Sequence, residues 1–166
     1  MIRVTGLLRR AGCFDDMGKL DPEVARRGTT LHAWSIHAED NPRTPYPPMI
    51  EGYAPAFLDY HQTLKPNWIW REQNISVPAL GLAGRLDRFG RASGAWTVAD
   101  LKTGGACDWH RLQLALYALL VEASSGRTVE RRQAVYVRKD GTWKQVIHTD
   151  EADLLEARAM IAEFGR

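Results

Sequence analysis

Hydrophobic residues follow a helical spacing in some stretches of the chain and gather in short runs bounded by Gly and Pro in others. The first pattern predicts helices over Val4–Ala11, Asp21–Ala38, Ala56–Leu64, Asp108–Ala123 and Glu151–Phe164. The second predicts strands over Trp68–Val77, Gly81–Phe89, Ala95–Leu101, Arg132–Arg138 and Trp143–His148. Because strands and helices are interspersed, we expect an α/β (α+β) fold with a mixed central sheet of about five strands flanked by helices.

Capping and turn residues mark where these elements begin and end. Asp21-Pro22-Glu23 is typical of a helix start, with an acid at the N-cap and Pro at the first helical position. The helix must end before the Pro-rich segment 41–48, which could act as a lid or hinge but is no domain boundary. Turns at 91–94 and 140–141 predict hairpins. We therefore expect residues 1–166 to form a single domain.

Composition narrows the class of protein without identifying a ligand. The chain has 166 residues, 45% of them hydrophobic and 25% charged, which is a normal globular balance. Its formal net charge is only +2, so nucleic-acid binding would have to use local basic patches. The candidates are arginines, for which a solvated basic face is the alternative: Arg9, Arg10, Arg26, Arg27, Arg85 and Arg88.

The cysteines and the apolar runs indicate the cellular compartment of the protein. Cys13 and Cys107 are far apart and predict free thiols in a reducing cytoplasm, and two cysteines cannot hold a four-cysteine iron–sulfur cluster within one chain. The apolar stretch within Met1–Arg10 is too short for a signal peptide. The longest fully apolar run, Leu114–Val121, is far shorter than the ~20 residues of a membrane span. We expect a cytoplasmic protein without a membrane partner.

Asp100-Leu101-Lys102, at the end of the third predicted strand, is the first group that suggests chemistry. Side chains alternate along a strand, so Asp100 and Lys102 should point one way and Leu101 into the core. The carboxylate can hold a divalent cation, the ammonium can offset charge on a phosphate, and the Leu101 carbonyl is a further candidate ligand. An ordinary exposed acid and lysine is the alternative for this tripeptide alone.

Asp87 strengthens the case for a metal site. It is near the end of the second strand, and a hairpin through 91–94 would bring it close to Asp100. Two carboxylates on neighbouring strands repel each other unless a cation lies between them. Such hard oxygen ligands suit Mg²⁺ or Mn²⁺. The alternative is a solvated acid balanced by Arg85 and Arg88.

Polar residues on two predicted helices are further candidates. Gln113 and Tyr117 are four residues apart on an otherwise apolar helix, so they share one face and need partners, which a bound phosphate, the catalytic strands or the backbone could supply. His32 could be a metal ligand or a structural histidine. Gly28, in the same predicted helix, weakens it by about 1 kcal/mol relative to Ala, which suggests close approach to another backbone or to DNA.

Together these motifs resemble the PD-(D/E)XK nuclease superfamily, in its RecB-type exonuclease branch. The resemblance covers roughly residues 1–125, and each motif alone is weak, whereas four in order are specific. The matching segments are Arg27-Gly28 followed by His32, Gly84-Arg85-Leu86-Asp87, Asp100-Leu101-Lys102-Thr103-Gly104, and Gln113 with Tyr117.

The resemblance implies a restriction-endonuclease-like core and a DNA nuclease, of a stand-alone and phage-like kind, acting in recombination or repair with a possible recombination partner protein. It implies a Mg²⁺ or Mn²⁺ site made of His32, Asp87, Asp100 and the Leu101 carbonyl. Asp87, Asp100 and Lys102 would be catalytic, and Gln113, Tyr117, Arg27 and Arg85 would bind substrate. Glu72 is similar to an acid often found near this site.

Four other functions remain open at this point, and the first, a structural or interaction protein, leaves the ordered set of polar residues unexplained. A non-catalytic DNA-binding module on the same fold would be favoured by a missing acid or lysine, and neither is missing. A structure-specific endonuclease would use the same residues. The segment 100–104 is also similar to the phosphorylated Asp-Lys-Thr-Gly of ion-pumping ATPases, but Leu101 separates acid from lysine and no membrane helices are predicted.

Overall fold

The computed structural model describes residues 1–14 and 21–165 and contains a six-stranded mixed sheet at its centre. In chain order its strands are β1 (Ile2–Arg3), β2 (Asn67–Val77), β3 (Leu82–Ala92), β4 (Ala95–Lys102), β5 (Arg131–Val137) and β6 (Trp143–His148). The helices are α1 (Val4–Arg10), α2 (Pro22–Asp40), α3 (Tyr53–Leu64), α4 (Trp109–Ser125) and α5 (Glu151–Phe164), with short 3₁₀ turns η1 (Pro48–Ile50) and η2 (Pro78–Leu80).

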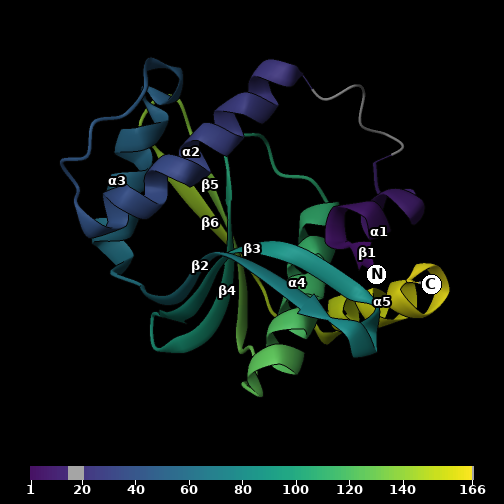
Figure 1. Cartoon of the computed structure of the whole chain (residues 1–166). Coiled ribbons are helices and arrows are strands. Elements are labelled where there is room, and N and C mark those ends of the chain that lie inside the picture. Colours follow the sequence, from purple (N-terminus) through teal and green to yellow (C-terminus); the bar gives the residue numbers. More distant parts are fainter. Residues whose placement is uncertain (15–20, 166) are drawn as a thin grey trace.

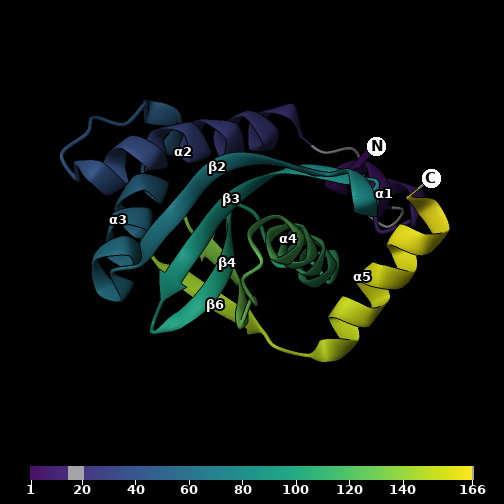
Figure 2. The ribbon, with the colours of Figure 1, turned by 60° about the horizontal axis from the view of Figure 1, so that its bottom comes forward.

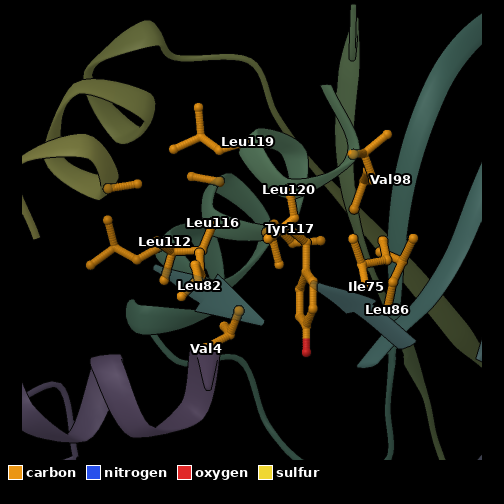
Figure 3. Close-up of a cluster of buried hydrophobic side chains, with 14 of the residues drawn as sticks. Val4, Ile75, Leu82, Leu86, Val98, Leu112, Leu116, Tyr117, Leu119 and Leu120 are labelled. Carbon is orange, nitrogen blue, oxygen red and sulfur yellow. The ribbon is translucent and has the colours of Figure 1, made fainter. Parts of the chain in front are cut away.

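Helices cover both faces of the sheet (Figures 1 and 2). α4 lies with α1 and α5 on one face, and α2 and α3 lie on the other (Figure 2). The core is correspondingly in two parts. One gathers around Leu116 of α4 and Leu82 and Leu86 of β3 (Figure 3), and the other joins Leu31 and Phe57 of the opposite helices to the sheet. The predicted α/β class with helices on a mixed sheet is confirmed.

The predicted caps and turns form the expected bonds. Asp21 Oδ1 accepts from the Glu23 amide at 2.8 Å, and Asp150 Oδ1 accepts from the Ala152 amide at 2.9 Å. Each bond satisfies one of the amides that a helix start leaves without a partner, which stabilises the helix by about 1 kcal/mol. Gly141, at φ 83°, forms the turn between β5 and β6.

The expectation of about five strands missed β1. Ile2 and Arg3 pair in parallel with Leu82 and Ala83 at the start of β3. A two-residue strand is too short to show any alternation, so the sequence pattern could not reveal it. The Pro-rich segment ends in η1, where the side chain of Ile50 is fully buried in the core. The helix α3 begins at Tyr53, three residues before the predicted start.

The strands β3 and β4 form a hairpin that opens toward the end of β4. The ladder joins residues 88–92 to 95–99, which confirms the hairpin predicted at 91–94. On the same edge, β1 reaches only Leu82 and Ala83, so in the described chain no ladder partner borders residues 84–87 there. β4 continues beside β5, with Lys102 opposite Tyr136. A fork therefore opens between β3 and β4 where Asp87 and Asp100 lie.

Among the described helices, none has both the length and the apolarity needed to cross a bilayer.

Candidate metal and active centre

The side chain of Asp87 fills the fork between the two strands. It is 8% exposed, and its Oδ2 accepts from the Leu101 amide at 2.9 Å. The alternation of β3 is interrupted at this point, because Leu86 packs in the core on the α4 side whereas Arg88 contacts Glu39 of α2. Strict alternation would put Leu86 and Arg88 on one face. The irregularity turns the Asp87 carboxylate toward β4.

Glu72 on β2 is opposite Asp87 in the same irregularity. Arg71 pairs with Arg88 and Gln73 with Leu86, so Glu72 and Asp87 face each other in register. Glu72 has φ 48°, in the left-handed region that a residue with a long side chain rarely adopts and that costs roughly 1–3 kcal/mol. The surrounding ion pairs hold it there: its Oε1 is 3.1 Å from Arg88 Nη1 and its Oε2 is 3.0 Å from Arg85 Nε.

His32 of α2 joins these groups to β4. Its Nδ1 is 2.9 Å from Glu72 Oε1 and 3.4 Å from Asp87 Oδ2, and its Nε2 is 2.9 Å from the Leu101 carbonyl oxygen. Burial alone would lower the pKa of His32, but the charge of Asp87 and the hydrogen bond and charge of Glu72 raise it from 6.5 to about 9. At neutral pH both ring nitrogens therefore carry protons, and Nδ1 donates to Glu72 Oε1 while Nε2 donates to the Leu101 carbonyl oxygen.

The surrounding groups shift the pKa values of the two neighbouring carboxylates in opposite directions. Burial raises the pKa of Asp87 to about 7 against the charge of His32, and the charges of Asp100 and Glu72 add to the rise. Burial would also raise the pKa of Glu72, but the hydrogen bond and charge of His32 and the charge of Arg88 lower it. Asp87 is thus the carboxylate that a bound cation would stabilise most, because burial disfavours its charged form.

Lys102 is held on three sides. Its Nζ lies 2.6 Å from Asp100 Oδ2, 2.7 Å from Gln113 Oε1 and 5.1 Å from the centre of the Trp109 ring. This confirms that Asp100 and Lys102 share a face, while Leu101 packs in the opposite core. Trp109 and Gln113 are four residues apart on α4, so they meet the ammonium from one helical face.

Two polar side chains of α4 form hydrogen bonds with the strands β3 and β4. Gln113 bonds to Lys102 of β4, and the backbone of Arg85 of β3 bonds to the Tyr117 hydroxyl. Figure 3 shows that hydroxyl pointing out of the hydrophobic cluster. Both side chains are buried, with 8% and 6% exposure, so the catalytic strands supply their partners. The predicted contact of Gln113 and Tyr117 with DNA remains a prediction.

The donor set fits a hard divalent cation. His32, Glu72 and Asp87 each offer a ligand atom within 4.8 Å of the others. Two ligands of one octahedral ion are about 3 Å apart, which agrees with the 2.9 Å between His32 Nε2 and the Leu101 carbonyl. Asp100 Oδ2 is buried and accepts no well-formed hydrogen bond within the described chain, although it is ion-paired with Lys102. Such an oxygen is suited to a metal ion.

The centre opens into a groove of about 370 Å³ between α2 and the segment that follows β4. Gly28 and His32 line one wall, and Lys102, Gly104 and Trp109 line the other. A Cβ at Gly28 would be 3.9 Å from Thr103 Oγ1. The predicted close approach of Gly28 to another backbone is therefore wrong within the described chain, and its close approach to DNA remains a prediction.

The predicted arginines lie in different settings. Arg88 is 4% exposed and bonds to Glu39 and to Ser35, so its prediction as a contact to the DNA backbone is wrong. The sequence could not show this, because only the fold brings α2 to it. Arg27 is partly buried over the ring of Tyr53, whereas Arg85 is exposed.

The remaining basic candidates are exposed. Arg10 donates to the Phe164 carbonyl at 3.2 Å, Arg9 lies 6.0 Å from the centre of the Phe14 ring, and Arg26 is exposed on α2. The alternative that Asp87 is a solvated acid is also wrong, since its side chain is buried. Neither Cys13 nor Cys107 forms a disulfide within the described chain.

The sequence reasoning missed Trp109 and gave Glu72 only a minor place. A signal for Trp109 was present, since it precedes Gln113 by four residues and so shares its helical face. No comparable signal marked Glu72, because its left-handed backbone and its contact with His32 arise only when β2 pairs with β3 below α2.

Comparisons with known proteins agree with this fold. The structure is similar to that of a candidate exonuclease from Eubacterium rectale, with a TM-score of 0.62, 14% identity, and coverage of 98% of this chain and 77% of that one. It is also similar to an alkaline exonuclease from Laribacter hongkongensis, with a TM-score of 0.53, 12% identity, and coverage of 98% and 84%. No curated protein matches the sequence. The family model of the PD-(D/E)XK nuclease superfamily matches residues 19–164, and the chain belongs to this superfamily.

Proposed function

We propose that the chain is a divalent-metal-dependent deoxyribonuclease that acts as an exonuclease in DNA recombination or repair. The observation that carries this proposal is the convergence of His32, Asp87 and the Leu101 carbonyl beside the Asp100–Lys102 pair at one groove. The names of the two similar structures, both exonucleases, favour cleavage from an end.

Each residue has a distinct part in the proposed reaction. Mg²⁺ or Mn²⁺ held by His32, Asp87, Asp100 and the Leu101 carbonyl would supply an activated water and offset phosphate charge. The water would lose a proton to solvent and its oxygen would bond to phosphorus, while the bond from phosphorus to the departing sugar oxygen would break and that oxygen would take up a proton from solvent. Lys102, fixed by Asp100 and Gln113, places positive charge where negative charge builds on the phosphate.

Glu72 has a supporting part in this arrangement. A histidine that binds a metal through one nitrogen usually donates the N–H of the other to a carboxylate, which fixes the ring. Glu72 is 2.9 Å from His32 Nδ1, which leaves Nε2 to face the Leu101 carbonyl and the ion. We therefore assign Glu72 to the orientation of His32.

The test uses end-labelled linear DNA and closed circular DNA of one sequence, each with Mg²⁺ or Mn²⁺ and with a chelator. Shortening of the linear DNA beside an intact circle is the expected result. Nicking or cutting of the circle would make the chain an endonuclease. DNA binding without cleavage under every metal condition would leave a binding module and overturn the proposal.

A further inference from the structure

A second cleft lies next to the acidic centre, because Arg85, which lines this cleft, is ion-paired with Glu72. It has a volume of about 200 Å³ and is lined by Arg3 of β1, Asn74 and Ser76 of β2, and Ala83 and Arg85 of β3. None of these residues belongs to the metal and lysine groups described above.

Strand register places the polar groups of this cleft in a row that leads to the centre. Arg3 pairs with Ala83, and Asn74 pairs with Arg85. Ala83 and Arg85 are two residues apart on β3, so Arg3, Asn74 and Arg85 share one face of the sheet. The row joins the centre through Glu72, whose Oε2 is 3.0 Å from Arg85 Nε and whose Oε1 is 2.9 Å from His32.

The row offers donors that the protein leaves largely unused. The Arg85 side chain is 58% exposed, and its ion pair with Glu72 uses Nε, so the outer edge of the guanidinium faces solvent. Arg3 is exposed and makes no ion pair or side-chain hydrogen bond with the described residues. Two guanidinium groups and an amide are suited to phosphate oxygens, which they can bind in a bidentate manner.

The cleft is open because small residues form its bottom. Ala83 has a small side chain, and the position of Gly84 points to the other face, where a Cβ would be 2.7 Å from Tyr117 Cε1 and 3.0 Å from Val4 Cγ2. No large side chain therefore rises between the two arginines.

The spacing between alternate residues of β3 matches that of a ligand whose charged groups repeat regularly. Positions 83, 85 and 87 follow in steps of two residues, or about 6.6 Å each, with Arg3 beside the first and the catalytic acid at the last. An extended nucleic-acid strand repeats its phosphates at a comparable spacing. We propose that this cleft binds the phosphodiester backbone of the strand being cut, with Arg85 one nucleotide and Arg3 two nucleotides from the cleaved bond.

This proposal rests on the proposed nuclease function and is tested by binding without turnover. The affinity of wild type and of Arg3→Ala for a DNA oligonucleotide is measured in Ca²⁺ at several salt concentrations. We expect weaker binding by Arg3→Ala and a slope of log affinity against log salt that is smaller by roughly 0.7–0.9, as for one lost phosphate contact. Arg3→Lys should keep the slope, and Arg43→Ala, which changes an exposed arginine in the loop after α2, should leave it unchanged.

Neutral linkages locate the two contacts. Single methylphosphonate groups are placed at successive positions of the oligonucleotide, and affinity is measured for wild type, Arg3→Ala and Arg85→Ala. Each variant should become insensitive to one linkage, and the position for Arg85 should be one nucleotide nearer to the cut than the position for Arg3. Additive effects at every position, or the reverse order, would overturn the proposal. Cleavage of the same oligonucleotide by wild type with Mn²⁺ reports separately on the nuclease function.

Discussion

At the scale of single residues, the centre depends on side chains turned out of their regular directions. Asp87 points into a fork between strands, and Glu72 adopts a left-handed backbone opposite it. The conformation of Glu72 is unfavourable alone and is held by its charged partners Arg88 and His32. Strain of this kind concentrates at functional sites because the surrounding structure over-determines it.

The catalytic assignment predicts that Asp100→Asn and Lys102→Ala each lower cleavage by about 10²–10³ or more, because Asp100 would hold the metal ion and fixes Lys102, and Lys102 places positive charge at the reacting phosphate. The fold should survive, since the Lys102 amine lies at the groove and Asn preserves the volume of Asp100. Nuclease assays beside circular dichroism of purified variants provide the measurement. Near-normal cutting by either variant would move the active site elsewhere.

The metal assignment predicts that His32→Ala weakens Mn²⁺ binding by about tenfold or more and affects Mg²⁺ binding less. Imidazole is a softer ligand than water or carboxylate and so favours Mn²⁺. Glu72→Gln should weaken Mn²⁺ binding in the same direction, because the carboxylate fixes the ring. Calorimetric titration of both ions measures this. Equal Mn²⁺ affinity in wild type and His32→Ala would leave His32 a packing residue, with Glu72 and Asp87 as the ligands to reconsider.

At the scale of the elements, two glycines of the predicted motifs serve different purposes. Gly84 lets β3 approach the Tyr117 ring of α4, whereas a Cβ at Gly28 on α2 would make only an ordinary van der Waals contact with Thr103. The first is required by packing between a strand and a helix. The second weakens its own helix and gains nothing from the contacts within the described chain.

The two settings predict that replacing glycine by alanine has opposite effects on stability at positions 84 and 28. Gly84→Ala should destabilise the protein by roughly 1–3 kcal/mol, because the added methyl group overlaps Tyr117 and Val4. Gly28→Ala should stabilise it by about 0.5–1 kcal/mol, since the helix gains a better former and nothing is displaced. Urea unfolding of the two variants beside wild type gives both values, and a loss of stability in Gly28→Ala as large as in Gly84→Ala would contradict the packing described for these positions.

At the scale of the whole molecule, stability should depend on pH through the centre. The pKa of His32 is raised to about 9 in the folded protein and that of Asp87 to about 7. Both groups hold a proton more tightly when folded, so their contribution is present at low pH and is lost as pH rises through these values. Between pH 7 and 9.5 the histidines with a lowered pKa, such as His110, are neutral in both states and add no slope.

We therefore predict that the metal-free protein loses several degrees in Tm between pH 7 and 9.5. With Mn²⁺ the fall should be smaller or reversed, because metal binding needs neutral His32 and charged Asp87. His32→Gln should flatten the decline of the metal-free form. Thermal scans in chelator and in Mn²⁺ decide the matter, and a metal-free Tm that rises over this range would contradict the assignment of the raised pKa values.

The motifs of the sequence indicated the superfamily. The sequence by itself also determined the order of the helices and of the strands from β2 onward, the caps and turns, and the common face of Asp100 and Lys102. These depend on local rules, because hydrophobic spacing, capping residues and strand alternation act over a few positions. The tertiary structure alone decided that Glu72 holds His32, that Arg88 is buried against α2, that Trp109 meets Lys102, and that β1 brings Arg3 beside Ala83. Each of these contacts joins residues on different elements, and no local pattern records which elements a chain will pack together.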